Sequence, residues 1–157
     1  MPDRIFLDTN ILLYTTVDDG SDKHAKCHNL LAVILVGSEL VASVQVLNEY
    51  YVNALKKNIA PVEIQNTVKQ FIADFEIVPL AKELIPETYR ICNRYQFSYW
   101  DSNIVAAALE AKCTTLYTED LQDGQVIDNT LTVVNPMLHS GLDGFSGHSP
   151  KHDFMLS

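Results

Sequence analysis

Basic residues are scarce in this sequence. The chain has 11 Lys and Arg residues against 20 Asp and Glu residues, so its formal net charge is −9. This excess of acid excludes a broad basic surface that grips nucleic acid. A small local site stays open, because bound cations could supply the positive charge there.

Cysteines and long apolar runs are also few. The three cysteines, Cys27, Cys92 and Cys113, are an odd number and lie far apart, which argues against a disulfide framework or a zinc ribbon. We therefore expect reduced thiols in a cytoplasmic protein. No apolar stretch reaches the roughly 18 residues of a membrane span, and the start, MPDRIF, lacks the pattern of a signal peptide. We expect no membrane partner.

Length and composition favour one globular domain. A chain of 157 residues, 47% of them hydrophobic, needs neither a disulfide nor a structural metal to fold. We expect this domain to cover residues 1–138. The remaining residues, 139–157, are rich in Gly, Ser and His without any period, and we expect them to form a flexible C-terminal tail.

Short apolar runs alternate with helical patterns along the chain. The runs that predict strands are residues 5–7, 39–43, 76–80, 114–118 and 131–136. The helical patterns are residues 23–36, 44–57, 62–75, 81–96, with Pro86 as a break or restart, and 102–112. A further short helix is expected after Asp8. This alternation predicts an α/β fold in which a parallel sheet of about five strands is covered on both faces.

Four acidic residues occupy suggestive positions in this outline. Asp8 directly follows the first strand, Asp120 follows the fourth, Asp101 opens the last helix, and Glu49 lies in the helix after the second strand. Sites in such sheets form at the carboxyl ends of the strands, so we expect these acids to converge. Converging carboxylates repel one another unless a cation neutralises them. Oxygen ligands suit Mg²⁺ or Mn²⁺, which commonly act on phosphate esters.

Each acid also has a purely structural interpretation. Asp8 could start a turn or cap the helix that follows it. Asp101 could complete a capping box with Ser98. Glu49 could be a solvated helix residue, and Asp120 could be a turn residue. The order of all four along the chain, and none of them alone, favours a metal site.

Four short motifs in this order resemble those of the PIN domain family. They are LDTNIL (7–12), SVQVLNE (43–49), WDSNIVAAA (100–108) and LYTEDLQDGQ (116–125), and VNP at 134–136 closes the series. PIN domains are small metal-dependent nucleases. The resemblance spans about residues 4–137 and implies a three-layer α/β/α fold.

The resemblance also implies the members of the site. Asp8, Glu49, Asp101 and Asp120 would bind Mg²⁺ or Mn²⁺ and carry out catalysis. The residues expected to support them are Thr9, Asn10, Ser102 and Thr118. Glu119 and Asp123 flank the fourth acid, and either could replace Asp120 as the ligand.

Single PIN domains of this length are similar to VapC-type toxins of toxin–antitoxin pairs. This likeness implies a cytoplasmic, homodimeric endoribonuclease that hydrolyses RNA and is blocked by a protein antitoxin. The alternative is a catalytically silent PIN-like module that binds RNA or protein, but all four acids are present. A phosphatase of the haloacid-dehalogenase type also begins with a strand and an Asp. It requires a second acid where this sequence has Asn10.

Overall fold

A single mostly parallel sheet organises the chain. The computed structural model describes residues 2–139. In that range the strands are β1 (Asp3–Leu7), β2 (Ser38–Ser43), β3 (Glu76–Val78), β4 (Thr115–Tyr117), β5 (Val126–Ile127) and β6 (Leu131–Val134). Their order in the sheet is β3-β2-β1-β4-β6-β5. All neighbours pair in parallel except β5 and β6, which are antiparallel.

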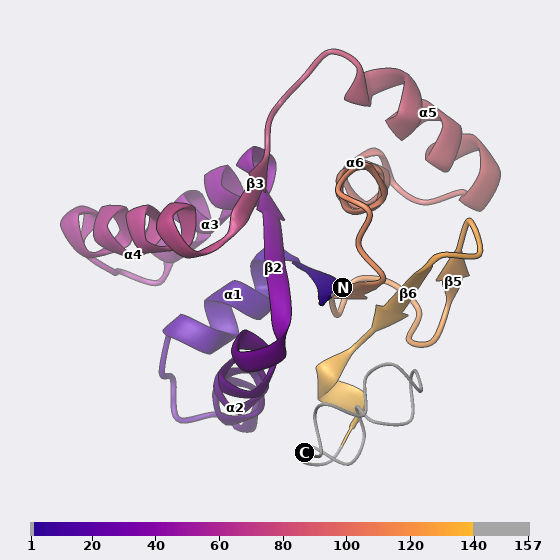
Figure 1. The fold of residues 1–157 in the computed structure, drawn as a ribbon. Helices are drawn as coiled ribbons and strands as arrows, with labels where there is room; N and C mark the ends of the chain where they lie inside the picture. The colour runs from indigo at the N-terminus through magenta and orange to yellow at the C-terminus, as the bar shows by residue number, and fades with distance from the viewer. Residues whose placement is uncertain (1, 140–157) are drawn as a thin grey trace.

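Helices cover both faces of this sheet. They are α1 (Thr9–Thr16), α2 (Asp22–Gly37), α3 (Val44–Lys56), α4 (Pro61–Asp74), α5 (Leu84–Tyr95) and α6 (Tyr99–Glu110), and a short 3₁₀ helix spans Pro136–Leu138. Helices α1 to α4 lie on one side of the sheet and α5 and α6 on the other (Figure 1). The expected three-layer α/β/α fold is therefore confirmed.

The direction of the crossovers creates a switch point in the middle of the sheet. From β1 the chain moves to β2 and β3 on one side, and it then returns through α5 and α6 to β4 on the other side of β1. The connections that leave β1 and β4 therefore diverge. In open α/β sheets a crevice forms at the carboxyl ends of two such strands, and ligands bind there.

Local sequence signals set most helix boundaries. The Ser43 hydroxyl accepts a hydrogen bond from Val46 N at 3.1 Å and caps α3, and Ser98 does the same for Asp101 N at 3.1 Å in α6. Pro61 is the first residue of α4, where its missing N–H costs nothing. Pro86 does not break a helix. It lies in the first turn of α5, where backbone N–H groups have no partner inside the helix.

The central strand lies within the core. Ile5 and Phe6 are fully buried, and Phe6 pairs with Val41 of β2 on one side and Leu116 of β4 on the other. A strand buried on both faces explains why β1 has a continuous apolar run without alternation. The three cysteines are free, as expected.

Two features differ from the sequence-based outline or lie beyond it. The two-residue strand β5 was not expected, and it extends the sheet from about five strands to six. The tail predicted for residues 139–157 lies, apart from His139, outside the described residues. Among residues 2–139, no helix combines the length and apolar character needed to cross a bilayer.

The burial of β4 gives a test of the fold. Leu116→Ala removes a fully buried side chain, so we expect the free energy of unfolding in urea to fall by about 2–5 kcal/mol. Leu35→Ala in α2 makes the same change at a side chain that is 50% exposed, and we expect a change within about 0.5 kcal/mol. Equal losses at the two positions would contradict the position of β4 in the core.

Candidate active site

The residues that follow two neighbouring strands, β1 and β4, lie at the switch point. Asp8 comes directly after β1, and its backbone N–H donates to the carbonyl oxygen of Tyr117 in β4 at 3.1 Å. Thr118 and Asp120 come directly after β4. The carboxyl ends of β1 and β4 therefore place these three residues at one edge of the sheet.

Asp8 is a buried carboxylate that also caps a helix. Its side chain is 5% exposed, and it accepts hydrogen bonds from Thr9 N at 2.7 Å and from the Thr118 hydroxyl at 2.8 Å. The cap at the start of α1 is the structural role considered from the sequence. The structure gives Asp8 that role and also places it at the edge where the other acids gather.

Glu49 points from α3 toward the start of α1. Its Oε2 accepts a hydrogen bond from the Thr9 hydroxyl at 3.2 Å, and its Oε1 accepts one from Gln45 Nε2 at 2.9 Å. Gln45 precedes Glu49 by four residues, so the two side chains lie on one face of the helix. Glu49 is thus a partly buried, oriented carboxylate rather than a freely solvated one.

Asp120 forms hydrogen bonds with one residue of α1 and with one residue of the loop after β4. Its Oδ2 accepts a hydrogen bond from Asn10 Nδ2 at 3.1 Å, and its backbone N–H donates to the Thr118 hydroxyl at 3.1 Å. The Thr118 hydroxyl thus donates to Asp8 and accepts from Asp120. One buried hydroxyl therefore couples the two acids that follow neighbouring strands.

Asp101 lies in the first turn of α6, where its backbone N–H is capped by Ser98. Its carboxylate accepts no hydrogen bond from any residue that the structure describes. Its charge nevertheless acts on Asp120, as the pKa of that residue shows. Asp101 thus combines the capping position expected from the sequence with a place near the other acids.

The pKa values show that the acids lie within electrostatic reach of one another. Burial raises the pKa of Asp8 to about 7, and the charges of Asp120 and Glu49 add to the shift, while the hydrogen bonds from Thr118 and Thr9 oppose it. The pKa of Asp120 is raised as well, first by the loss of water around its carboxylate and then, to a smaller extent, by the charges of Asp101, Glu119 and Glu49. Glu49 and Asp120 therefore act on Asp8, and Asp101 and Glu49 act on Asp120, which links four carboxylates from separate parts of the chain.

Three of the four supporting residues expected from the sequence contact these acids. Thr9, Asn10 and Thr118 each donate to a carboxylate, whereas the hydroxyl of Ser102 is buried and has no hydrogen-bond partner in the described part of the chain. The carbonyl oxygen of Asn10 is likewise buried and unpaired within residues 2–139. The sequence analysis missed Gln45, although its spacing of four residues from Glu49 was a usable signal.

The two flanking acids have other partners. Glu119 accepts hydrogen bonds from the Tyr14 hydroxyl at 2.5 Å and from Lys23 Nζ at 3.4 Å. Asp123 accepts them from Asn135 N at 2.8 Å and from His139 Nε2 at 3.2 Å. Both carboxylates are thus engaged in local structure, which favours Asp120 over either of them as a ligand.

The donor set fits a hard divalent cation. Every candidate donor is a carboxylate, amide or hydroxyl oxygen, the ligand type that Mg²⁺ and Mn²⁺ prefer. The unpaired oxygen of Asn10 and the raised pKa values of Asp8 and Asp120, to which neighbouring carboxylates contribute, fit such a cation. Over residues 2–139, no three His, Cys, Asp or Glu side chains stand close enough together to hold an ion, so binding requires the carboxylates to draw inward.

The raised pKa of Asp8 predicts a pH-dependent cost to folding in metal-free protein. Between about pH 4 and pH 7, folded Asp8 keeps a proton that the unfolded chain has released, so stability falls as the pH rises through this window. Asp8→Asn removes that cost, which corresponds to roughly 4 kcal/mol, but also loses charge-assisted hydrogen bonds. We therefore expect the variant to be about 1–3 kcal/mol more stable than wild type at pH 8.

Urea denaturation in the presence of a chelator, repeated from pH 4 to pH 8, measures this difference. The advantage of Asp8→Asn should shrink as the pH is lowered. Glu63→Gln, at an exposed position of α4, is the matched control and should follow the wild-type profile. An advantage of Asp8→Asn that is constant with pH would contradict the burial of an ionisable Asp8.

Comparisons with known proteins agree with this architecture. The family model described as the PIN domain matches residues 5–122. A search of curated proteins found none that matches the chain. Among solved structures, a toxin–antitoxin complex from Klebsiella pneumoniae is similar, with a TM-score of 0.62, 20% identity, and coverage of 84% of this chain and 97% of the other.

Two further solved structures share the fold. VapBC2 from Rickettsia felis, bound to a promoter DNA fragment, has a TM-score of 0.61, 19% identity, and coverage of 84% of this chain and 99% of the other. Mycobacterium tuberculosis VapC20, a toxin that cleaves the sarcin–ricin loop, has a TM-score of 0.61, 15% identity, and coverage of 74% and 91%. At these identities the likeness establishes the fold, whereas the family model matches most of the sequence itself. The chain belongs to the PIN domain family.

Proposed function

We propose that this protein is a metal-dependent endoribonuclease and acts as the toxin of a toxin–antitoxin pair. One observation carries the proposal: carboxylates from the residue after β1, from α3, from α6 and from the loop after β4 interact at the switch point of a PIN fold. An arrangement of like charges that destabilises the metal-free protein is readily explained by a role in binding a cation.

The proposed ligands are Asp8, Glu49, Asp101 and Asp120, which together would hold one or two Mg²⁺ or Mn²⁺ ions. When bound, such an ion activates water, orients the phosphate and stabilises the charge on the leaving oxygen. The protein's own groups set the orientation of the ligands. Thr118 and Thr9 N hold Asp8, and supports of this kind tune both metal affinity and activity.

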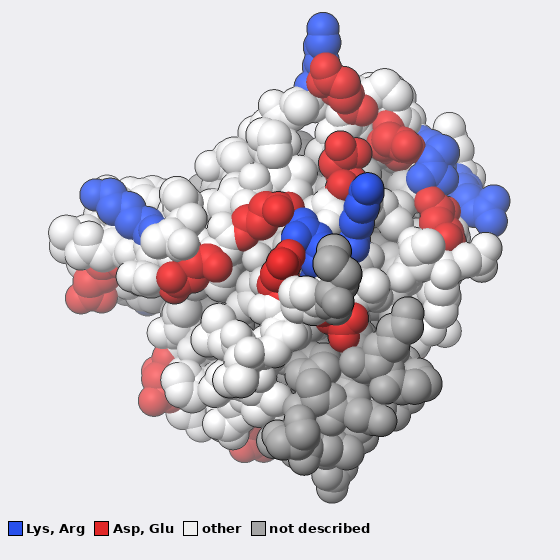
Figure 2. Space-filling view, viewed as in Figure 1, with Lys and Arg blue, Asp and Glu red and all other residues white. Residues whose placement is uncertain are grey.

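RNA in single-stranded or loop form is the proposed substrate. On the face shown in Figure 2, acidic side chains are interspersed with the Lys and Arg side chains. Such a surface does not favour an extended phosphate backbone, so contact with the substrate would be local. VapC20, which shares the fold, cleaves the sarcin–ricin loop. By analogy we propose that a short unpaired segment enters the site here.

The proposed partners follow from the same comparisons. The solved structures from K. pneumoniae and R. felis are toxin–antitoxin complexes, and we propose an antitoxin protein and a homodimeric state for this chain too. The three free cysteines are compatible with a reducing cytoplasm. The alternative function, a catalytically silent PIN-like binding module, differs from this proposal in its response to RNA and metal.

Loss of a proposed ligand should abolish cleavage. We expect Asp8→Asn and Asp120→Asn to lower the rate of RNA hydrolysis by more than the roughly 100-fold that loss of a supporting residue costs. The measurement is cleavage of a labelled RNA in Mn²⁺, with loss of activity in chelator and recovery on adding metal. Since no side chain is needed to activate the 2′-hydroxyl, the products should carry 5′-phosphate and 3′-hydroxyl ends.

Glu119→Gln and Asp123→Asn are the matched controls, because each neutralises an acid beside Asp120 that has other partners. Both should retain cleavage within about tenfold, less than loss of a metal ligand costs. If Glu119→Gln abolishes cleavage and Asp120→Asn does not, the fourth ligand has been misassigned. Wild-type activity in Asp8→Asn would rule out the proposed site.

Metal binding can be tested without any substrate. A cation that binds only the folded state raises the melting temperature. We expect millimolar Mn²⁺ to raise that of wild type by several degrees, because about 1 kcal/mol shifts a domain of this size by about 2–4 °C.

The same melt with Asp8→Asn should show little or no shift, and Glu63→Gln should shift like wild type. If neither wild type nor Asp8→Asn responds to Mn²⁺, the silent binding module becomes the better description. A response of equal size in both would place the bound metal elsewhere.

A further inference from the structure

A hollow of about 290 Å³ lies beside the acidic site, between the start of α6 and the loop that joins β3 to α5. The lining residues that matter here are Gln45, Leu80, Ile85, Tyr99, Trp100 and Asn103. We call it the Trp100 hollow. Its volume is at the small end of the range for ligand pockets, about 300–1,000 Å³, so it suits one flat ring system rather than a long segment.

The hollow shares one wall residue with the proposed active site. Gln45, which lines it, donates from Nε2 to Glu49 at 2.9 Å. Trp100 directly precedes Asp101 in the first turn of α6. Through Gln45 and the start of α6 the hollow therefore adjoins the acids, and one short RNA segment would contact both.

The aromatic wall of the hollow is open to solvent. Trp100 is 57% exposed, and its ring meets that of Tyr99 edge to face, with centroids 5.1 Å apart. Tyr99 in turn contacts Tyr89 of α5, with centroids 6.2 Å apart. The indole is thus supported at its edge by a neighbouring ring while much of its surface stays available for another ring to stack on.

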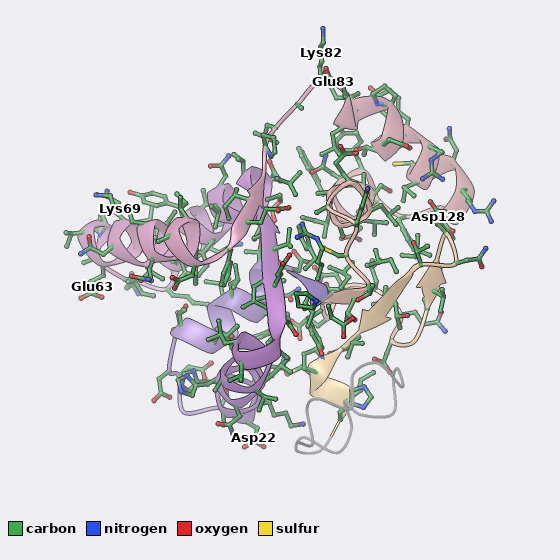
Figure 3. All side chains as sticks on the ribbon, viewed as in Figure 1. Asp22, Glu63, Lys69, Lys82, Glu83 and Asp128 are labelled. Carbon is green, nitrogen blue, oxygen red and sulfur yellow. The ribbon has the colours of Figure 1, made fainter. Side chains whose placement is uncertain are left out.

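The other parts of the lining complete a site for a planar, partly polar group. Leu80 and Ile85 are exposed by 57% and 43% and supply apolar surface. The side-chain amides of Gln45 and Asn103 add polar atoms to the lining, and their nitrogens donate to Glu49 at 2.9 Å and to Thr88 at 3.3 Å. Lys82 also lines the hollow, and it lies at the outer end of the loop before α5 (Figure 3), where its ammonium group can meet a phosphate.

We propose that the Trp100 hollow receives one unpaired base of the RNA substrate, stacked on the indole beside the phosphate that is cleaved. This inference rests on the proposed ribonuclease function. A base is favoured over a protein partner because amides and a cation accompany the apolar surface, and because Gln45 belongs both to the hollow and to the acidic site. Bases in a duplex are already stacked and paired, so only single strands or loops present one to such a surface.

Trp100 is the sole tryptophan of the chain, so its fluorescence reports directly on the hollow. The cleavage-deficient Asp8→Asn protein is titrated with a single-stranded RNA of mixed sequence, about ten nucleotides long, within the range of single-strand site sizes. We expect saturable quenching. The same RNA as a duplex, or an abasic strand of equal length, should give little. Equal quenching by the abasic strand, or RNA binding without quenching, would show that no base stacks on Trp100.

Two substitutions separate stacking from general apolar contact. Trp100→Phe keeps an aromatic face, whereas Trp100→Leu keeps only apolar bulk. We expect Trp100→Leu to weaken single-strand binding and raise KM by roughly 5- to 150-fold, the span implied by one base–aromatic stack. Trp100→Phe should stay within about threefold of wild type, because a smaller ring still stacks. Both variants should keep the wild-type response of the melting temperature to Mn²⁺, which shows that the acids remain in place.

The outcomes also separate this inference from the proposed function. If wild type cleaves RNA and Trp100→Leu cleaves it equally well, the hollow does not bind a base, although the nuclease assignment stands. If Trp100→Leu instead alters the oligomeric state in sedimentation while cleavage is unchanged, the hollow is a protein–protein surface and the inference is wrong. If wild type neither binds nor cleaves RNA, both proposals fail together.

Discussion

Asp8 has a buried carboxylate, and the hydrogen bonds that this carboxylate accepts position the residues around it. Its carboxylate accepts hydrogen bonds from the Thr9 backbone and the Thr118 hydroxyl. The same hydroxyl accepts from Asp120 N, so Thr118, which binds Asp8, also fixes the backbone of the loop after β4. Without Asp8 at the end of β1, neither this loop nor the start of α1 would have its present anchor.

These bonds stabilise the charge of Asp8 only in part. The first N–H groups and the dipole of α1 favour a carboxylate at the helix start, yet burial and two neighbouring acids win, and the pKa rises to about 7. Metal-free protein at neutral pH therefore holds a site that works against its own stability. Such conflicts between local chemistry and folding are typical of functional sites, and the proposed cation would relieve this one.

Much of this arrangement follows from the sequence because it depends on topology. Parallel strands bring their carboxyl ends to one edge, so Asp8 and Asp120 were predictable neighbours. For Asp8 the capping interpretation and the placement among the acids are compatible, because its carboxylate accepts from Thr9 N at the start of a helix that itself lies at the site. Helix α6 is capped by Ser98, and among the described residues the carboxylate of Asp101 does not complete the expected capping box. From the sequence, capping a helix and belonging to the acidic site were alternatives, although one side chain can have both roles.

What escaped prediction has physical causes of its own. Strand β5 has two residues, too few to show any period, and its pairing depends on the turn that leads into β6. Pro86 was expected to break or restart the helix predicted over residues 81–96. That helix begins at Leu84 instead, which places Pro86 in the first turn, where proline is tolerated. The exposure of Trp100 could not be inferred, because an aromatic residue before a helical pattern is equally typical of a core.

An acidic chain can still act on RNA, as proposed, if it does not bind RNA through many phosphate contacts. Proteins that neutralise many phosphates release many counterions and need a basic surface. A site that uses a cation for one phosphate and a stacked ring for one base needs no such surface, because stacking does not depend on net charge. The acids around the site then have a further consequence: they repel the phosphates that no cation neutralises. Under the proposed function, long strands bound through their backbone would be disfavoured, and short unpaired segments that present a single base and a single phosphate would be selected.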